Sequence, residues 1–188
     1  MSGMDRQPVL QGPRLTLRPL RRADRGALYE LARDPEVWAG HPSHDRWLEP
    51  VFDRFFEDGL ERGGALAVCA SGDGTLIGSS QFGIAEAEAP GEIELGWSFL
   101  GRAYWGLGHN PEIKGLMLAH TLRHYERAIF QVGSENVISR RAMTKIGGVL
   151  TARTRSFERA GKIVEHVIFE ITRESFEAGP LAGFARFV

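Results

Sequence analysis

The stretch of this chain that decides its fold reads Tyr104-Trp105-Gly106-Leu107-Gly108-His109-Asn110-Pro111-Glu112-Ile113-Lys114. An apparent strand precedes it and a helical pattern follows it, so a turn with glycines leads directly into a helix. Such a turn approaches a ligand closely, and the first helical turn offers unpaired N–H groups and the positive end of the dipole. Asn110 is expected to cap the helix, with Pro111 at its first position. The pattern predicts a site for a phosphate-bearing ligand, although such turns also serve as plain connectors.

The size and charge of the chain limit what it can be. Its 188 residues and 43% hydrophobic content suit one substantial core, so we expect a single domain over residues 1–188, with a core at 12–172 and a tail at 173–188. Lys plus Arg number 23 against 24 Asp plus Glu, giving a net charge of −1. No global field is available to gather nucleic acid or anionic membrane.

Cysteine and histidine usage argues against disulfide and metal chemistry. The single cysteine, Cys69, lies in an apolar run and is expected to be core, in a reducing compartment. His120 and His124 are four apart, but Thr121 stands where a zinc protease motif needs glutamate, and we expect no metal site. No apolar run of about 18 residues and no secretory leader is recognised, so we expect a soluble, cytoplasmic protein.

The hydrophobic pattern predicts a mixed α/β layout. Period-two alternation or short buried runs predict strands, and apolar residues at helical spacing predict helices. The expected strands are 14–20, 65–70, 76–84, 91–100, 128–132, 149–157 and 163–171, and the expected helices start at 24 or cover 48–60, 111–127 and 135–146. The aromatic tail at 173–188 is expected to pack on the body of the protein or on a second subunit.

The strand at 91–100 alternates most strongly. Its apolar set is Ile93, Leu95, Trp97 and Phe99, and its other set is Glu92, Glu94, Gly96 and Ser98. Because side chains alternate across a strand, the second set is predicted to share one wet or functional face. Glu94 and Ser98 are therefore expected to lie side by side.

Several motifs, in order along the chain, resemble the GNAT superfamily of acyl-CoA-dependent N-acyltransferases. The resemblance covers roughly residues 12 to 172. Its pieces are the first strand and helix at 14–24, the fourth strand at 93–97, the pyrophosphate loop at 104–108 and the helix at 136–147 that lies beside the pantetheine arm. Trp105, Gly106, Asn110, Glu112 and Lys114 look most like the branch that includes ribosomal-protein N-terminal acetyltransferases.

The resemblance implies a mixed, mostly antiparallel sheet flanked by helices, with a splayed cleft between the fourth and fifth strands of the family fold. Two positions depart from the family pattern. The basic or glutamine residue that usually begins the phosphate loop is Ala103, and the tyrosine that many relatives use as an acid toward the leaving thiolate is Met143. A tyrosine acid at that position is excluded.

The chemistry that the resemblance implies is transfer of an acetyl group from acetyl-CoA to an amine. Glu94 is the preferred base, because family members often have a carboxylate there, and Ser98 is a candidate to position water or protonate the thiolate. His41 and His44, in a loop that commonly shapes the acceptor pocket, are the alternative bases.

The cofactor contacts expected for acetyl-CoA are mainly main-chain groups. N–H groups near Phe99 and Leu100 would bind the thioester oxygen as it gains charge. Lys114 is a candidate point charge for phosphate, Asn136 and Ser139 would face the same ligand arm, and Arg141 would reach nucleotide phosphates. The main-chain groups of the turn are those of Gly106, Leu107, Gly108, His109 and Asn110.

Some alternatives stay open at this point. A catalytically silent acyl-CoA-binding sensor on the same fold would explain the altered loop and the missing tyrosine. The amine could belong to a protein N-terminus or to a small molecule, since the variable loops at 37–47 and 85–90 carry no readable motif. The chain could be a monomer or a homodimer.

Overall fold

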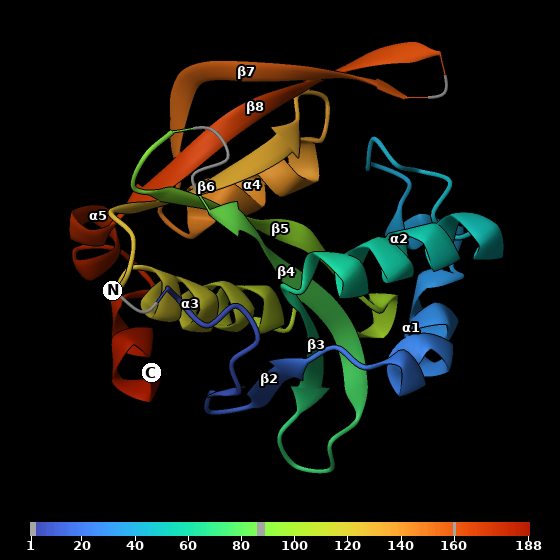
Figure 1. Ribbon diagram of the computed structural model, residues 1–188, viewed down its shortest axis with the longest axis horizontal. Coiled ribbons are helices and arrows are strands. Elements are labelled where there is room, and N and C mark those ends of the chain that lie inside the picture. The colour runs from blue at the N-terminus through green and yellow to red at the C-terminus, as the bar shows by residue number, and fades with distance from the viewer. Residues whose placement is uncertain (1–2, 86–88, 160) are drawn as a thin grey trace.

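The computed structural model describes residues 3–85, 89–159 and 161–188. Their centre is an 8-stranded sheet of order β1-β2-β3-β4-β5-β6-β8-β7, in which only β5 and β6 pair in parallel (Figure 1). The strands are Leu10–Gln11 (β1), Leu15–Pro19 (β2), Ala65–Ala70 (β3), Leu76–Ala85 (β4), Glu92–Leu100 (β5), Arg127–Gly133 (β6), Val149–Arg159 (β7) and Lys162–Thr172 (β8). The predicted mixed, mostly antiparallel α/β fold is confirmed.

Helices cover both faces of the sheet. The α-helices are Arg25–Ala32 (α1), Glu49–Arg62 (α2), His109–Thr121 (α3), Val137–Lys145 (α4) and Arg173–Glu177 (α5). Short 3-10 segments lie at Arg22–Asp24 (η1), Pro35–Val37 (η2), Arg102–Tyr104 (η3) and Ala182–Phe187 (η4). Figure 1 shows α1 and α2 on one side of the central strands and α3 on the other.

Alternation along β3 shows how the sequence builds a core on each face. Leu66 and Val68 join the cluster on the α3 face, whereas Ala67 and Cys69 join the cluster under α1 and α2. The small side chains on the second face allow close packing, since a Cβ added at Gly59 of α2 would lie 3.3 Å from the Ala65 Cβ. Both faces of the central strands are therefore covered by helices.

The helix predicted over 111–127 has different ends in the structure. It begins at His109 and stops at Thr121. Beyond it the chain turns back, and the N–H groups of Glu126 and Arg127 donate to the Gly91 carbonyl at 2.9 and 3.3 Å. Pairing with the start of β5 thus outcompetes the helical pattern at residues 122–127.

The tail packs on the body of the chain, which was one of the two alternatives. Phe176 and Leu181 are in the core, and Phe184 lies against α3 so closely that a Cβ added at Gly115 would be 2.2 Å from its ring. Thr172 caps α5 by accepting a hydrogen bond from the Ser175 N–H. These short helical turns were absent from the prediction because they span too few residues for a period to show.

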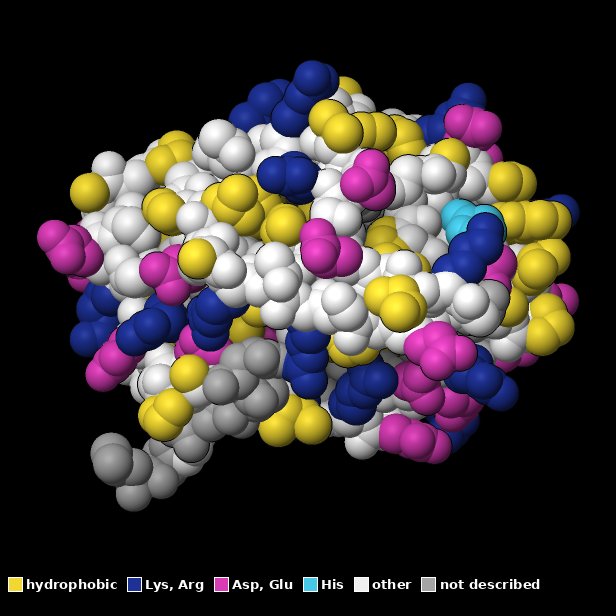
Figure 2. All heavy atoms as spheres, turned by 90° about the horizontal axis from the view of Figure 1, so that it is seen from above, with side chains coloured by type: hydrophobic (Ala, Val, Ile, Leu, Met, Phe, Trp, Pro, Cys, Tyr) yellow, Lys and Arg dark blue, Asp and Glu magenta, His cyan; other side chains and the backbone are white. Residues whose placement is uncertain are grey.

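The surface carries charges of both signs. On the face in Figure 2, basic and acidic side chains are interspersed with hydrophobic ones. None of the helices in the described ranges combines the length and apolarity needed to cross a bilayer.

Candidate functional site

The strands β5 and β6 separate partway along their length. They pair from Glu92 with Arg127 to Glu94 with Ile129, and the described residues show no pair beyond that point. Yet β5 continues to Leu100 and β6 continues to Gly133. The predicted splay of the family's fourth and fifth strands therefore lies between β5 and β6.

A β-bulge at Trp97 changes the direction of the side chains along β5. Trp97 has φ of 51°, the one positive value among the described non-glycine residues. Phe99 pairs with Ser79, but Gly96 pairs with Gln81, so β5 holds one more residue than β4 between these pairs. The strict alternation expected for residues 91–100 is broken at this point.

Because of the bulge, Glu94 and Ser98 lie on opposite faces, and the prediction that they share one face is wrong. Leu95 belongs to the core cluster on the α3 face, whereas Phe99 packs on the α2 face with its ring 5.0 Å from that of Trp38. Glu94 therefore faces the α2 side and Ser98 faces α3. An extra residue in one strand reverses every side chain after it.

The same register decides which backbone groups face the splay. Gly101 N–H donates to the Ile77 carbonyl in β4 at 3.0 Å, so Phe99, two residues earlier, also directs its N–H to β4. Ser98 and Leu100, the two neighbours of Phe99, direct their N–H groups to the opposite side, where β6 has separated from β5. Among the N–H groups near Phe99, those of Ser98 and Leu100 therefore face the splay, and that of Phe99 itself faces β4.

The glycine turn adopts the predicted left-handed conformations. Gly106 and Gly108 have φ of 72° and 79°. Gly108 is the N-cap and the helix begins at His109, so Asn110 is not the cap and Pro111 is not the first helical residue. A proline in the first turn still sacrifices no intrahelical bond, because those N–H groups have no helical partner.

The turn keeps its amides free. No described residue accepts a hydrogen bond from the backbone N–H groups of residues 106–110. Arg14 donates to the carbonyls of Leu107 and Gly108, each at 2.8 Å. In a planar trans peptide the N–H points opposite to the C=O, so the N–H groups of Gly108 and His109 point away from Arg14. Unpaired N–H groups at a helix N-terminus are groups that could hold an anion.

Glu112 holds Arg14 in this position. Its side chain is 1% exposed and accepts bonds from Arg14 Nε at 3.0 Å, Arg14 N–H at 2.8 Å and Leu15 N–H at 2.9 Å. The role of Arg14 could not be predicted from the sequence, because Arg14 and Glu112 are far apart in the chain. The one available signal was a carboxylate in the first turn of the helix that begins at the glycine turn.

Glu94 has the properties of a general base. Burial raises its pKa to about 7, partly offset by the charge of Arg62. Its Oε2 accepts a hydrogen bond from Gln131 Nε2 at 3.2 Å, across the splay. A base with a pKa near the working pH is both available and strong enough to take a proton.

The two alternative histidine bases are less suitable. Burial, aided by the charges of Arg46 and Arg159, lowers the pKa of His41 to about 3, and its Nδ1 accepts a bond from the Ser43 N–H at 2.9 Å. Such a group is a poor proton acceptor, and His44 is exposed. Within the described ranges, no three His, Cys, Asp or Glu side chains group as metal ligands.

Lys114 is buried, which corrects its predicted role as a point charge for phosphate. It is 3% exposed, and Nζ donates to Ser98 Oγ at 2.6 Å rather than lining the glycine turn. Burial lowers its pKa to about 8. Its contacts with Ser98 of β5 and the ring of Phe130 of β6 show that Lys114 faces the sheet, whereas a solvated helix lysine would point outward.

The helix α4 carries the remaining predicted contacts. Asn136 caps it, with Oδ1 accepting from the Ser139 N–H at 3.1 Å, so that oxygen is already used. Arg141 is exposed and borders a pocket of about 580 Å³. The lining residues of this pocket are Val137, Arg140, Arg141, Thr144, Lys145, Leu150 and Phe169.

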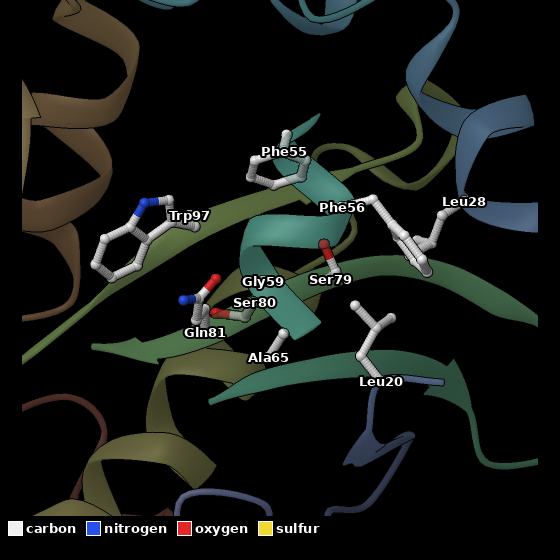
Figure 3. A pocket seen from close by; sticks show the side chains of 10 residues that line it. All are labelled: Leu20, Leu28, Phe55, Phe56, Gly59, Ala65, Ser79, Ser80, Gln81 and Trp97. Atoms are coloured by element: carbon white, nitrogen blue, oxygen red, sulfur yellow. The ribbon is translucent and has the colours of Figure 1, made fainter. Parts of the chain in front are cut away.

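A second, smaller pocket lies between α2 and the sheet (Figure 3). Figure 3 shows Trp97 and Gln81 at one end and Leu28 and Phe56 at the other. Its volume of about 10 Å³ suits one water molecule and no amine substrate. Gln81 Nε2 is buried and finds no hydrogen-bond partner among the described residues.

The turn, the splay and their order along the chain agree with a family match. Residues 14–149 match the family model described as an acetyltransferase (GNAT) domain. The chain belongs to the GNAT acetyltransferases. Acyl transfer is therefore the class of reaction of this family. The splay between β5 and β6, the glycine turn and α4 all lie within the matched residues.

Solved GNAT structures share the fold of this chain. A GCN5-related N-acetyltransferase from Brucella melitensis is 16% identical, with a TM-score of 0.78, covering 96% of this chain and 83% of that one. A GNAT-family acetyltransferase from Bacillus anthracis is 21% identical, with a TM-score of 0.72 and coverages of 89% and 99%. Mycobacterium smegmatis RimJ in complex with CoA-disulfide is 17% identical, with a TM-score of 0.67 and coverages of 96% and 89%.

This GNAT chain lacks a tyrosine at the position that many relatives use as an acid. Met143 stands there, 6% exposed, within the core cluster on the α3 face. A thioether has no proton to give, so Met143 cannot act as an acid.

Proposed function

We propose that this GNAT chain transfers an acetyl group from acetyl-CoA to a primary amine, by direct attack in a ternary complex. The observation that carries the proposal is the arrangement along β5. Glu94 lies where β5 and β6 separate, and the free amides of residues 106–110 follow the end of the same strand. The two features fit an acyl donor that spans them.

The chain's own groups account for donor binding. The amides of residues 106–110 and the positive end of the α3 dipole suit a diphosphate. The N–H groups of Ser98 and Leu100, which face the splay, suit the thioester oxygen as it gains charge. The RimJ structure in complex with CoA-disulfide has the same fold, which supports CoA as the carrier.

Glu94 would remove a proton from the attacking amine. A protonated amine cannot attack, and a carboxylate with a pKa of about 7 accepts that proton at neutral pH. Gln131 would hold the carboxylate at the mouth of the splay through its hydrogen bond. Holding amine and thioester together contributes on the order of 7–11 kcal/mol in the best cases.

The charges on the acceptor side favour some amines over others. Arg46, Arg62 and Arg159 act on the titration of His41 or Glu94, so cations surround this region. Besides Glu94, the acids there include Asp45, which already pairs with Arg159 at 2.9 Å, and Asp58, whose charge acts on Arg46. The region therefore has no excess of acid to attract a polyamine, and a protein N-terminus or a singly charged small amine fits better.

The test is release of free thiol from acetyl-CoA with a broad panel of amines, including peptides with free N-termini. Turnover with some acceptor, slowed in Glu94→Gln, is the expected result. Calorimetric binding of acetyl-CoA without turnover across the whole panel would overturn the enzyme proposal and favour the acyl-CoA sensor. Acetylation of a polyamine in preference to peptides would reject the acceptor assignment alone.

A further inference from the structure

Lys114 is a buried cation without a carboxylate. Its Nζ has two contacts among the described residues, Ser98 Oγ at 2.6 Å and the ring of Phe130, whose centroid is 5.6 Å away. Burying an ammonium without a counter-ion is costly, and burial is the sole cause that lowers its pKa. Fold stability alone gives no reason to keep such a residue.

The hydrogen bonds around Ser98 leave it with a proton to give. Its Oγ lies 2.7 Å from Ser80 Oγ and accepts from Lys114. An ammonium has only donors, and Ser80 is able to donate as well, so both acceptor sites of the Ser98 oxygen can be filled. Its own hydrogen then has only the Gly96 carbonyl at 3.3 Å, a long contact.

The position of Ser98 connects this cluster to the acyl donor. Ser98 follows the bulge, in the part of β5 from which β6 has diverged, and its N–H faces the opening. Met143 removes the expected tyrosine acid. Ser98 thus combines an N–H that faces the splay with a hydroxyl that is bonded to a cation.

We propose that Lys114 and Ser98 form a proton relay, in which Ser98 protonates the departing thiolate and Lys114 restores the Ser98 proton. The inference rests on the acetyl transfer proposed above. The amine lone pair forms the C–N bond and the C–S pair leaves on sulfur. Ser98 gives its hydroxyl proton to sulfur and takes one from Lys114 Nζ. The amine proton passes through Glu94 to solvent. After the products leave, a proton from water in the splay returns to Lys114 through Ser98, so atoms and charge balance.

Lys114 is a positioning residue in this scheme, because it acts through Ser98, and its titration should be visible in the rate. The fall in rate at low pH belongs to Glu94, which lies on the opposite face of the sheet. The other charged groups of the elements around Lys114 are bonded elsewhere or exposed. Glu92 pairs with Arg153, Glu112 with Arg14 and Arg127 with Glu126, while His109, His120 and Arg140 contact the carbonyls of Tyr104, Asp5 and Ser134. Arg141, Lys145 and Arg186 are exposed.

The experiment measures single-turnover thiol release from pH 6 to 10, for wild type, Lys114→Met, Ser98→Ala, the double variant and Ser80→Ala. Only protonated Lys114 supplies a proton, so the wild-type rate should fall as pH rises through about 8. Lys114→Met and Ser98→Ala should each lose that alkaline limb and about 100-fold in rate. Combining them should cost little more, because they interrupt one path.

Two controls separate the relay from a structural role. Ser80→Ala removes the neighbouring hydroxyl but leaves Lys114 on Ser98, so it should keep the alkaline limb. Calorimetric acetyl-CoA affinity should stay near the wild-type value in every variant. If Lys114→Met fails to fold, Ser98→Ala still decides the matter through its pH profile.

The failures are distinguishable. An alkaline limb retained in a folded Ser98→Ala or Lys114→Met variant would overturn the relay while the acetyl transfer stands. Wild-type protein without transfer to any amine would overturn the proposed function, and the relay with it. If the rate loss of the double variant were the product of the two single losses, Lys114 and Ser98 would not act in one path.

Discussion

Arg14 and Glu112 connect the first long strand to the glycine turn. Glu112 Oε2 lies 3.0 Å from Arg14 Nε, and the Arg14 guanidinium in turn binds the carbonyls of Leu107 and Gly108. The carboxylate is 1% exposed while Arg14 is 49% exposed, so the pair is anchored from within. Because the carbonyls of Leu107 and Gly108 point toward Arg14, the N–H groups of Gly108 and His109 point to the open side of the turn.

Arg14→Ala should therefore weaken CoA binding by about tenfold, roughly 1.4 kcal/mol. The turn would lose the two bonds that orient its carbonyls, and its free amides would no longer be preorganised. Titration calorimetry with CoA measures the change. Arg22→Ala is the matched control, because Arg22 is exposed and pairs with Glu57 on the surface. Equal CoA affinity in Arg14→Ala and Arg22→Ala would contradict this role.

Glu94→Gln should remove the acidic limb of the rate. The wild-type rate should rise as pH increases through about 7, because only the ionised carboxylate takes the amine proton. Loss of a general base lowers the rate by about 10²–10⁴-fold. Stopped-flow thiol release across pH 5.5–8 at saturating acetyl-CoA makes the measurement. If Glu94→Gln kept the same acidic limb in its pH–rate profile, that limb would belong to another group.

The same burial predicts a pH dependence of stability. The folded-state pKa of Glu94 is raised from 4.5 to about 7, so the folded state holds a proton that the unfolded state releases in this window. The free energy of unfolding should fall as pH rises from about 4.5 to 7, by at most about 3 kcal/mol. Urea unfolding of wild type and Glu94→Gln measures it, and parallel curves for the two proteins would refute the assignment.

Gly115→Ala should destabilise the fold by displacing the tail. The added Cβ would lie 2.2 Å from the Phe184 ring, and overpacking costs about 1–3 kcal/mol. Gly26→Ala in α1 is the control, since its Cβ would meet nothing within 4 Å and alanine favours helices. Thermal unfolding should shift by about 2–4 °C per kcal/mol for a chain of this size, downward only for Gly115→Ala. A stabilised Gly115→Ala protein would show that the tail does not pack there.

Arg141 stays a predicted contact for nucleotide phosphate. If it binds the 3′-phosphate, Arg141→Ala should lower the affinity for CoA by several-fold and leave that for dephospho-CoA unchanged. Arg33→Ala, on an exposed helix end beside Glu30, should alter neither. An equal loss for both ligands in Arg141→Ala would point to general electrostatics instead.

The fold was largely readable from the sequence because its strands and helices repeat with clear periods. The β3 and β4 hairpin, α2 and β5 all lie close to their predicted ranges. The glycines at 106 and 108 also took the left-handed conformations that such a turn requires. Sequence pattern and structure agree where the apolar face that the pattern predicts packs on the sheet.

The site was less readable, because non-local pairing decides it. Nothing in the residues 91–100 shows that an extra residue lies opposite β4, yet the bulge at Trp97 separates Glu94 from Ser98. Burial of Lys114 and the Arg14 contact to the turn depend on segments distant in the chain. Sequence spacing identified the groups but not their partners.

Binding of a diphosphate by the amides of residues 106–110 is testable at each amide separately. The ¹H–¹⁵N spectrum of labelled protein is recorded during titration with CoA and, separately, with pantetheine, which lacks the diphosphate. We expect large shifts of the Gly106, Leu107, Gly108, His109 and Asn110 amides with CoA and none with pantetheine. If these amides stayed unshifted in a CoA-saturated protein, the diphosphate would not bind at the turn.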